Sequence, residues 1–164
     1  GGSFSGAVQL AGQIISLGYL WNTIRVQGGA YGTGLVTRDT GLTACYSYRD
    51  PNGASSVESY RKCASFLREF AKNESDFTGF IIGTVANNST LMTPRTKAQT
   101  GDKFYFCNNT WEDRCCVRRE LLSATGAELI SLADALEKTI NDGGICIIGG
   151  KNNLTSPCPF ECLH

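Results

Sequence analysis

Hydrophobic residues recur at every third or fourth position between residues 7 and 24, which is the spacing of one face of an α-helix. The positions on this face are Ala7, Leu10, Ala11, Ile14, Leu17, Gly18 and Trp21. The pair Gly28-Gly29 follows, and such a pair is typical of the end of a helix. The pattern therefore predicts one long helix that is buried on much of its circumference.

The segment after the glycines changes to the period of a β-strand. Residues 30–37 and 42–48 flank the turn sequence Arg-Asp-Thr-Gly, and the second of these segments alternates between two sets of residues. One set is Leu42, Ala44, Tyr46 and Tyr48, and the other is Thr43, Cys45 and Ser47. We therefore expect a half-buried β-hairpin, ended by the sequence Asp-Pro-Asn-Gly at 50–53.

Three sequences predict helix starts in the rest of the chain, and two of them are capping boxes, which pair a Ser or Thr with a Glu three positions later. They are the capping box of Ser55 with Glu58, the sequence from Thr110 to Asp113, and the capping box of Thr125 with Glu128. The first predicts a long helix to about residue 73, the second a helix through Leu122, and the third a helix to Ile140. A short helix toward Phe104 is a further possibility.

Two apolar runs predict the remaining strands, at residues 78–86 and 144–149. The strands are few, the helices are apolar on one face, and the first strand pair is a hairpin. We therefore expect an α+β fold, with helices packed on one face of a largely antiparallel sheet.

Composition narrows the functional classes. The chain has 164 residues, of which 41% are hydrophobic, and fifteen Lys and Arg balance fifteen Asp and Glu. This charge balance does not favour nucleic acid or an anionic membrane as a partner, and no apolar run approaches the roughly 18 residues of a membrane span. We expect one domain at 1–150, cut at its N-terminal end, and a loop-like, Cys-rich tail at 151–164.

The eight cysteines are the unusual feature of the composition. Disulfide frameworks are typical of short secreted chains that lack a proper core. Four of the cysteines lie instead in periodic segments, where they behave as small hydrophobic residues: Cys45, Cys63, Cys115 and Cys146. We therefore expect mostly reduced thiols and an intracellular compartment.

Catalytic motifs that depend on histidine are missing from the sequence, since His164 is the single histidine. Cys158 and Cys162 lie close to it, but a structural zinc site normally takes four ligands with tighter spacing. A Cys-based metal-binding module stays an alternative, which near-stoichiometric zinc in the purified chain would reveal. The glycine-rich run at 28–34 resembles a phosphate loop, yet it follows a helix and precedes a strand, the reverse of the usual order.

Two sequence segments carry a resemblance to a known family. They are Leu-Trp-Asn-Thr-Ile-Arg-Val-Gln-Gly-Gly-Ala-Tyr-Gly at 20–32 and Ser-Tyr-Arg-Asp-Pro-Asn at 47–52. Together they resemble the presequence-protease branch of the pitrilysin/insulinase zinc metallopeptidases. The similarity continues through Ile81-Ile82-Gly83 and the region of Arg118, and it covers the chain to about residue 150. It implies the last of four homologous α/β domains of a clam-shell enzyme.

The resemblance implies specific roles. The zinc and its inverted His-x-x-Glu-His motif belong to the first domain, so this chain would supply no metal ligand. The fourth domain presents an Arg and a Tyr to the scissile peptide, which correspond to Arg25 and Tyr31, while Gly28, Gly29 and Ala30 would let the substrate backbone approach. A phenol and a guanidinium directed at a developing oxyanion would stabilise the transition state.

The residues alone allow other interpretations. Tyr31 can be an ordinary sheet aromatic, and Arg25 a cation favoured by the dipole at a helix C-terminus. The alternative function is a non-catalytic domain that packs or holds peptide. Ser-Tyr-Arg-Asp-Pro-Asn is expected to support the fold as a strand end and turn, with no catalytic role.

The family resemblance also sets expectations for the parent enzyme. The family's fourth domain begins with a strand upstream of its first helix, and nothing before Phe4 can supply one, which is why we expect a truncated domain. We expect the partners to be the N-terminal half of the same enzyme and a peptide substrate, in a bacterial cytoplasm or an organelle matrix. The isolated fragment should be inactive.

Overall fold

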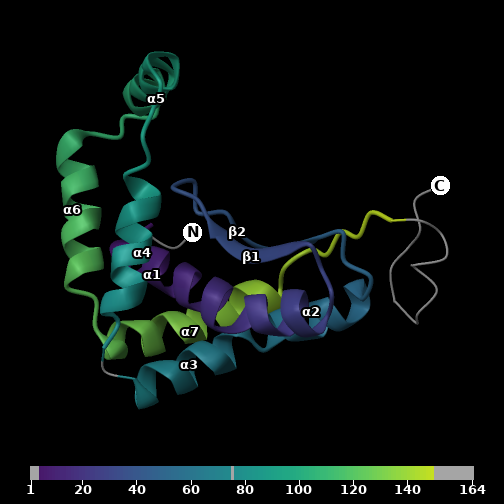
Figure 1. Cartoon of the computed structure of the whole chain (residues 1–164). Helices are drawn as coiled ribbons and strands as arrows, with labels where there is room; N and C mark the ends of the chain where they lie inside the picture. The colour runs from purple at the N-terminus through teal and green to yellow at the C-terminus, as the bar shows by residue number, and fades with distance from the viewer. Residues whose placement is uncertain (1–3, 75, 150–164) are drawn as a thin grey trace.

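A two-stranded antiparallel hairpin lies over a layer of helices (Figure 1). The computed structural model describes residues 4–74 and 76–149. Strand β1 (Gly32–Thr37) pairs with β2 (Thr43–Tyr48), with Gly32 opposite Tyr48 and Thr37 opposite Thr43. Helices α1 (Gly6–Ile14), α3 (Cys63–Asn73) and α7 (Gly126–Asn141) form the layer beneath it. This confirms the predicted α+β class and the predicted hairpin.

The first helix is longer and wider than its sequence pattern indicates. Ser5 caps α1 by accepting a hydrogen bond from the Val8 amide, and α1 continues directly into a π-helix, η1 (Ile15–Gln27). Turns of a π-helix close on the fifth residue instead of the fourth, so the α-helical period does not persist. The prediction that Leu17 and Trp21 face the core is therefore wrong, since they are 48% and 38% exposed.

The hydrophobic core forms where this first helix meets the other helices. Its largest fully buried side chains come from five elements, with most of them on α1 and η1: Leu10, Ile14, Ile15, Leu20, Ile24, Cys63, Leu67, Leu121 and Leu129. Arg68 ties α3 to α7 at the surface, through ion pairs of 2.7 Å with Asp134 and 2.9 Å with Glu137. The core extends to the hairpin, because Leu35 of β1 packs in it with residues of α1 and η1.

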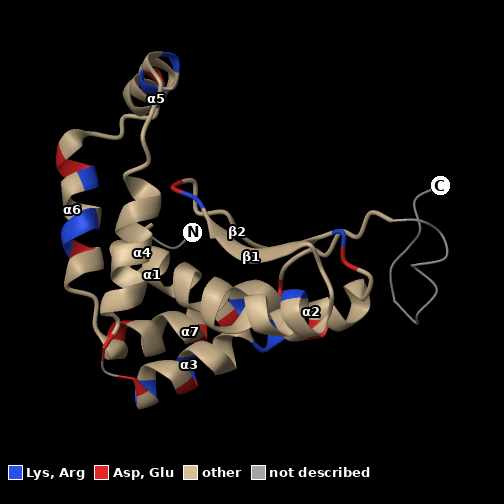
Figure 2. Ribbon diagram, in the orientation of Figure 1, with Lys and Arg blue, Asp and Glu red and all other residues tan. Residues whose placement is uncertain are grey.

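The face of β2 that points toward the core is the more polar one, although hydrophobicity favours the other face. The alternation in β2 is present, but the half-buried positions are Thr43, Cys45 and Ser47, while Ala44, Tyr46 and Tyr48 are exposed. Neither strand contains a charged residue, and charges gather at the two ends of the hairpin (Figure 2). The outer face of the sheet is therefore aromatic and uncharged.

The helix predicted from residue 55 to about 73 is two helices, α2 (Gly53–Arg61) and α3, separated at Lys62. The predicted capping box of Ser55 and Glu58 is wrong, because the helix begins earlier and the Glu58 carboxylate pairs with Arg61 over 2.9 Å. The capping box of Thr125 is confirmed at the start of α7. The helix start at Thr110 is also confirmed, as α6 (Trp111–Leu122), and the structure adds a capping box of Thr110 and Asp113 there.

The predicted strand at 78–86 is instead helix α4 (Thr78–Asn88). The residues of this region that pack against the core are spaced three or four apart, as a helix requires: Phe77, Phe80, Ile81 and Val85. Ile82, which a buried strand would also enclose, is 63% exposed. The packing against the core therefore overrides the β-propensity of the isoleucines and valine.

The predicted strand at 144–149 is also wrong, since the structure gives this segment no secondary structure. It runs beside β2, but no hydrogen bond joins its backbone to β2 within the described parts of the chain. Ile148 at its end is 95% exposed. None of its side chains belongs to the hydrophobic core, so no packing in the core fixes the register of this segment against β2.

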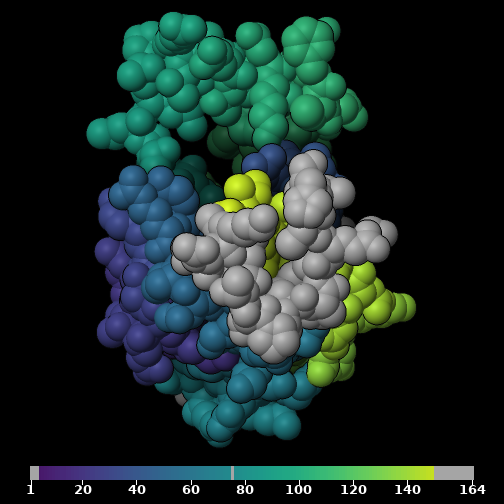
Figure 3. Space-filling view, turned by 90° about the vertical axis from the view of Figure 1, so that its right-hand side faces the viewer, coloured from purple at the N-terminus to yellow at the C-terminus, as the bar shows by residue number. Residues whose placement is uncertain are grey.

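Helices α5 (Pro94–Phe106) and α6 form an arm beside the body (Figure 1), and α5 stands above the rest in the turned view (Figure 3). Thr93 caps α5 and Pro94 takes its first position, so this helix begins well before the Phe104 region. An ion pair of 3.3 Å between Lys103 and Asp39 links α5 to the hairpin turn. No helix of the described residues is long and apolar enough to cross a membrane.

Candidate functional site

The glycine turn between η1 and β1 is fixed by its backbone. Gly29 has a φ of 80°, which glycine adopts readily and other residues rarely do. A Cβ atom on Gly28 would lie 2.6 Å from the Ile24 carbonyl oxygen, so a side chain does not fit there either. The amide groups of Gly29 and Ala30 donate to the carbonyls of Arg25 and Ile24, which ends the helix and starts the strand.

The second motif segment holds this turn in place. The Asn52 side-chain amide donates a hydrogen bond of 2.9 Å to the Gly28 carbonyl oxygen. Asp50 holds both Asn52 and the start of α2. Its carboxylate accepts hydrogen bonds from the backbone amide of Asn52 at 2.8 Å and from the Ser56 hydroxyl at 2.5 Å. The part of Ser-Tyr-Arg-Asp-Pro-Asn from Asp50 onward therefore acts as the supporting turn that the sequence analysis expects.

Tyr31 stands at the exposed end of the hairpin. Its side chain is 64% exposed, and its backbone amide donates to the Tyr48 carbonyl at 3.0 Å. The rings of Tyr31 and Tyr48 meet edge to face, with centroids 6.0 Å apart. The Arg49 guanidinium carbon lies 5.7 Å from the centroid of Tyr31 and 5.4 Å from that of Tyr48. Two tyrosines and one arginine thus form a surface cluster directly after the glycine turn.

Arg25 lies in the last turn of η1, on the other side of the glycines. Its guanidinium carbon is 4.0 Å from the centroid of the Trp21 ring, a cation–π contact. No hydrogen bond or ring contact joins Arg25 to Tyr31 among the described residues. The structure therefore places both predicted site residues at the same turn, each held by a different aromatic neighbour.

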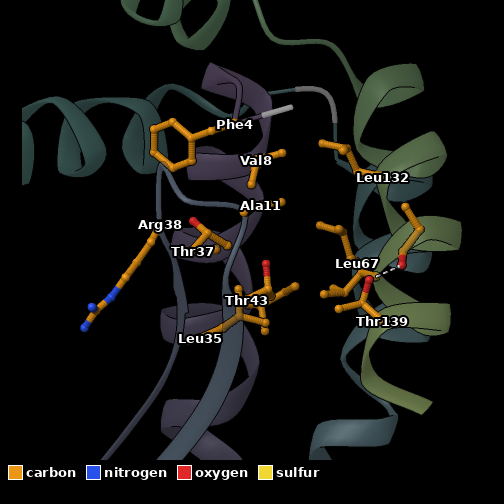
Figure 4. A pocket seen from close by; sticks show the side chains of 15 residues that line it. Phe4, Val8, Ala11, Leu35, Thr37, Arg38, Thr43, Leu67, Leu132 and Thr139 are labelled. Carbon is orange, nitrogen blue, oxygen red and sulfur yellow. Dashed lines mark hydrogen bonds between the residues drawn. The ribbon is translucent and has the colours of Figure 1, made fainter. Parts of the chain in front are cut away.

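Two cavities border the hairpin. One, of about 1280 Å³, follows β2 and is bounded by residues 143–149 and the Arg49 turn. Tyr60 also lines it, and burial raises the pKa of the Tyr60 phenol. The other, of about 210 Å³, is largely apolar and lies between α1, the turn end of the hairpin and α7, with Val8, Leu35 and Leu132 pointing into it (Figure 4). Of these two cavities, the first lies beside the Tyr31 cluster.

The donor groups of the chain bear on metal binding. Within residues 4–74 and 76–149, no group of three or more His, Cys, Asp and Glu side chains is placed to hold a metal ion. Cys158, Cys162 and His164 lie outside the described residues. The residues around Arg25 and Tyr31 therefore do not form a zinc site of their own.

Cys45 of β2 and Cys63 of α3 form a thiol pair between the hairpin and the helices. Their hydrogen bond and the burial of Cys63 raise the pKa of the Cys63 thiol, whereas the same hydrogen bond lowers the pKa of Cys45. Six cysteines fall within the described residues, and the structure has them as free thiols: Cys45, Cys63, Cys107, Cys115, Cys116 and Cys146. The pair is distant in sequence from Tyr31, and nothing in its contacts points to catalysis.

Comparison with known proteins decides the family. A family model described as the PreP C-terminal domain matches residues 1–151. The chain belongs to the PreP C-terminal domain family. The resemblance seen in the two sequence segments is thereby confirmed.

Curated relatives of this PreP C-terminal domain are much longer proteins. Protein HypA of Clostridium perfringens is 32% identical over 94% of the chain and 16% of its own length. Presequence protease 1, chloroplastic/mitochondrial, of Arabidopsis thaliana is 29% identical over 90% of the chain and 14% of its own length. The mitochondrial presequence protease of Mus musculus is 23% identical over 93% of the chain and 15% of its own length. The chain thus spans about one-seventh of these relatives.

Sequence reasoning missed the contribution of Arg49 to this PreP C-terminal domain. Arg49 lies within the Ser-Tyr-Arg-Asp-Pro-Asn segment, for which the sequence predicts only a supporting turn. It contacts Tyr31 and Tyr48 and has a left-handed backbone, with φ of 49°, and no periodicity reveals either feature. Its place in the sequence could have indicated the contact, because Arg49 directly follows β2 and lies opposite Tyr31, which directly precedes β1.

Proposed function

We propose that this domain encloses a peptide substrate of a longer zinc-dependent oligopeptidase and supplies Arg25 and Tyr31 to the reacting peptide bond. Membership of the PreP C-terminal domain family supports the protease context, and the names of two of the relatives include presequence protease. The activity belongs to the whole enzyme, of which the chain is one part. In this proposal the zinc is held by another part of the enzyme, as the family resemblance implies.

One observation carries the proposal. Tyr31 presents an exposed phenol directly after a glycine turn whose backbone is locked by Asn52. Gly29 has no side chain and is exposed, which leaves this side of the turn open to an extended peptide. The space beside Gly28 is taken by the Ile24 carbonyl, and the Ala30 methyl group is buried in the core, so neither residue offers a free surface to the substrate. The substrate backbone can therefore approach the turn closely enough to meet Tyr31.

The chemistry follows from the two side chains. When the carbonyl carbon of the scissile peptide is attacked, negative charge develops on its oxygen. The Tyr31 hydroxyl donates a hydrogen bond to that oxygen, and the Arg25 guanidinium supplies a positive, planar donor group. Both interactions are stronger with the developing oxyanion than with the neutral carbonyl, so they lower the barrier rather than only tightening substrate binding.

Tyr31→Phe in the full-length enzyme tests this proposal. The substitution keeps the ring that packs on Tyr48 and removes one donor, so we expect kcat to fall roughly 100- to 1000-fold, or about 2.7–4 kcal/mol. Zinc content and the unfolding temperature should stay unchanged. Tyr105→Phe on the exposed α5 is the matched control and should keep full activity. A kcat for Tyr31→Phe within about twofold of wild type would favour the non-catalytic, peptide-holding alternative.

The isolated chain gives a second test, because it lacks the proposed zinc-binding part. We expect the purified chain neither to bind zinc tightly nor to hydrolyse an internally quenched fluorogenic peptide. Metal analysis and the peptide assay check both points. If the purified chain hydrolyses the peptide and a chelator abolishes this activity, the proposal that another part of the enzyme binds the zinc is wrong.

The compartment is part of the same proposal. The names of two relatives place them in mitochondria or chloroplasts. We place the parent enzyme of this chain in an organelle matrix or a bacterial cytoplasm, where reduced thiols persist. Titration of the thiols in the denatured chain checks this proposal, because a reducing compartment should leave most of the cysteines free.

A further inference from the structure

Arg49 has a backbone conformation that is costly for its residue type. Its φ is 49°, in the left-handed region. Among the described residues the only other non-glycine residue with positive φ is Asn108, at 50°. Asparagine tolerates this region because its short amide bonds locally, whereas arginine gains no such relief. Residues held in such conformations cluster at functional sites, where other contacts offset the cost.

The contacts that hold Arg49 are aromatic. Its guanidinium lies over the rings of both Tyr31 and Tyr48, at 5.7 and 5.4 Å from their centroids. Within residues 4–74 and 76–149 it forms no ion pair with a carboxylate. The Arg49 guanidinium therefore contacts the two rings, and no carboxylate of the described residues pairs with its charge.

Tyr31 has little else to fix its ring. Its side chain is mostly exposed, and no described residue makes a hydrogen bond with its hydroxyl. Among the described residues, its ring contacts are the edge-to-face contact with Tyr48 and the guanidinium of Arg49. A phenol that must meet a developing oxyanion needs this direction fixed, because small displacements of reacting groups reduce the rate strongly.

We propose that Arg49 is a positioning residue for Tyr31, which holds the phenol in the direction that the reaction requires. This inference rests on the proposed function, since it gives Arg49 a role only through the Tyr31 hydroxyl. In this inference Arg49 acts through Tyr31 and not through a contact of its own with the substrate. Arg49 combines a left-handed backbone with a guanidinium that lies over the Tyr31 ring.

Arg49→Gly in the full-length enzyme separates positioning from support of the fold. Glycine accepts the left-handed backbone without strain, so the unfolding temperature should stay equal or rise. We expect kcat for an internally quenched fluorogenic peptide to fall about tenfold, with KM within about twofold. Asn108→Gly is the matched control, because it relieves the same backbone conformation at the turn before α6. It should keep both kcat and KM.

Two further variants complete the test. Arg49→Lys keeps a cation that can lie over the rings, so it should recover part of the lost kcat. In the double variant Arg49→Gly, Tyr31→Phe, the loss should equal that of Tyr31→Phe alone, because Arg49 then has no hydroxyl to position. A double variant slower by the full factor of both single changes would overturn the inference.

The outcomes distinguish this inference from the proposed function. If Arg49→Gly leaves kcat within about twofold while Tyr31→Phe slows the enzyme, the inference fails and the proposed function stands. If Tyr31→Phe itself has no effect, both fail. A lowered unfolding temperature for Arg49→Gly, with activity lost in proportion to the unfolded fraction, would show a merely structural residue.

Discussion

The side-chain amide of Asn52 donates a hydrogen bond to the carbonyl oxygen of Gly28, across 24 residues of sequence. This bond joins the two segments that carry the family resemblance, the one ending in Gly-Gly-Ala-Tyr-Gly and the one ending in Asp-Pro-Asn. The glycine turn has no side chains of its own to hold it. Its geometry therefore depends on a side chain that comes from the end of the hairpin.

Asn52→Ala should loosen the turn that precedes Tyr31. We expect the free energy of unfolding to fall by about 1 kcal/mol, since one hydrogen bond is lost and its partner stays accessible to water. Urea unfolding of the chain measures this change. Asn22→Ala, on the exposed side of η1, is the control and should leave stability within about 0.5 kcal/mol. Equal stability of the two variants would show that the Asn52 bond contributes nothing.

Arg25→Lys tests whether Arg25 acts through its planar group. Lysine keeps the charge but loses the fork of donors and the flat stack on Trp21. We expect kcat of the full-length enzyme to fall about tenfold or more, with KM little changed, because the lost interaction belongs to the transition state. Arg61→Lys in α2 is the matched control. Full activity of Arg25→Lys would reduce Arg25 to a simple positive charge at a helix end.

The thiols give a prediction that is independent of catalysis. We expect most of the eight cysteines to titrate as free thiols in denaturant without reductant. In the native chain the exposed Cys107, Cys116 and Cys146 should react first. Cys63 should react last, because it is fully buried and its raised pKa lowers the fraction present as thiolate. Four disulfides in the denatured chain would contradict the proposed intracellular compartment.

The parts of the fold that sequence predicted well are those with local signals. The glycine pair, the hairpin turn and the helix starts at Thr110 and Thr125 all act through neighbouring backbone groups, so they are visible without tertiary structure. The segment at 78–86 misled the prediction because its isoleucines and valine favour a strand. Its true state depends on contacts with α1, which only the assembled fold provides.

The candidate site was predictable only in part. Arg25 and Tyr31 were found through family resemblance, and their roles stay a prediction. The inverted face of β2, which turns Tyr46 and Tyr48 outward, was not predictable, because the polar Thr43, Cys45 and Ser47 occupy the half-buried side. The cation–π contacts of Arg49 and its left-handed backbone are tertiary and local geometry that neither composition nor periodicity encodes.

The π-helical turns of η1 give the chain spare length just before the glycine turn, because each of them holds more residues than an α-helical turn. Removing one residue from such a turn leaves enough chain for an α-helical turn, so the elements on both sides can keep their places. The same removal within α1 would rotate every side chain upstream of it by about 100° relative to the core. Deleting the exposed Leu17 should therefore disturb Arg25 and Tyr31 less than deleting Gln9 disturbs the packing of α1.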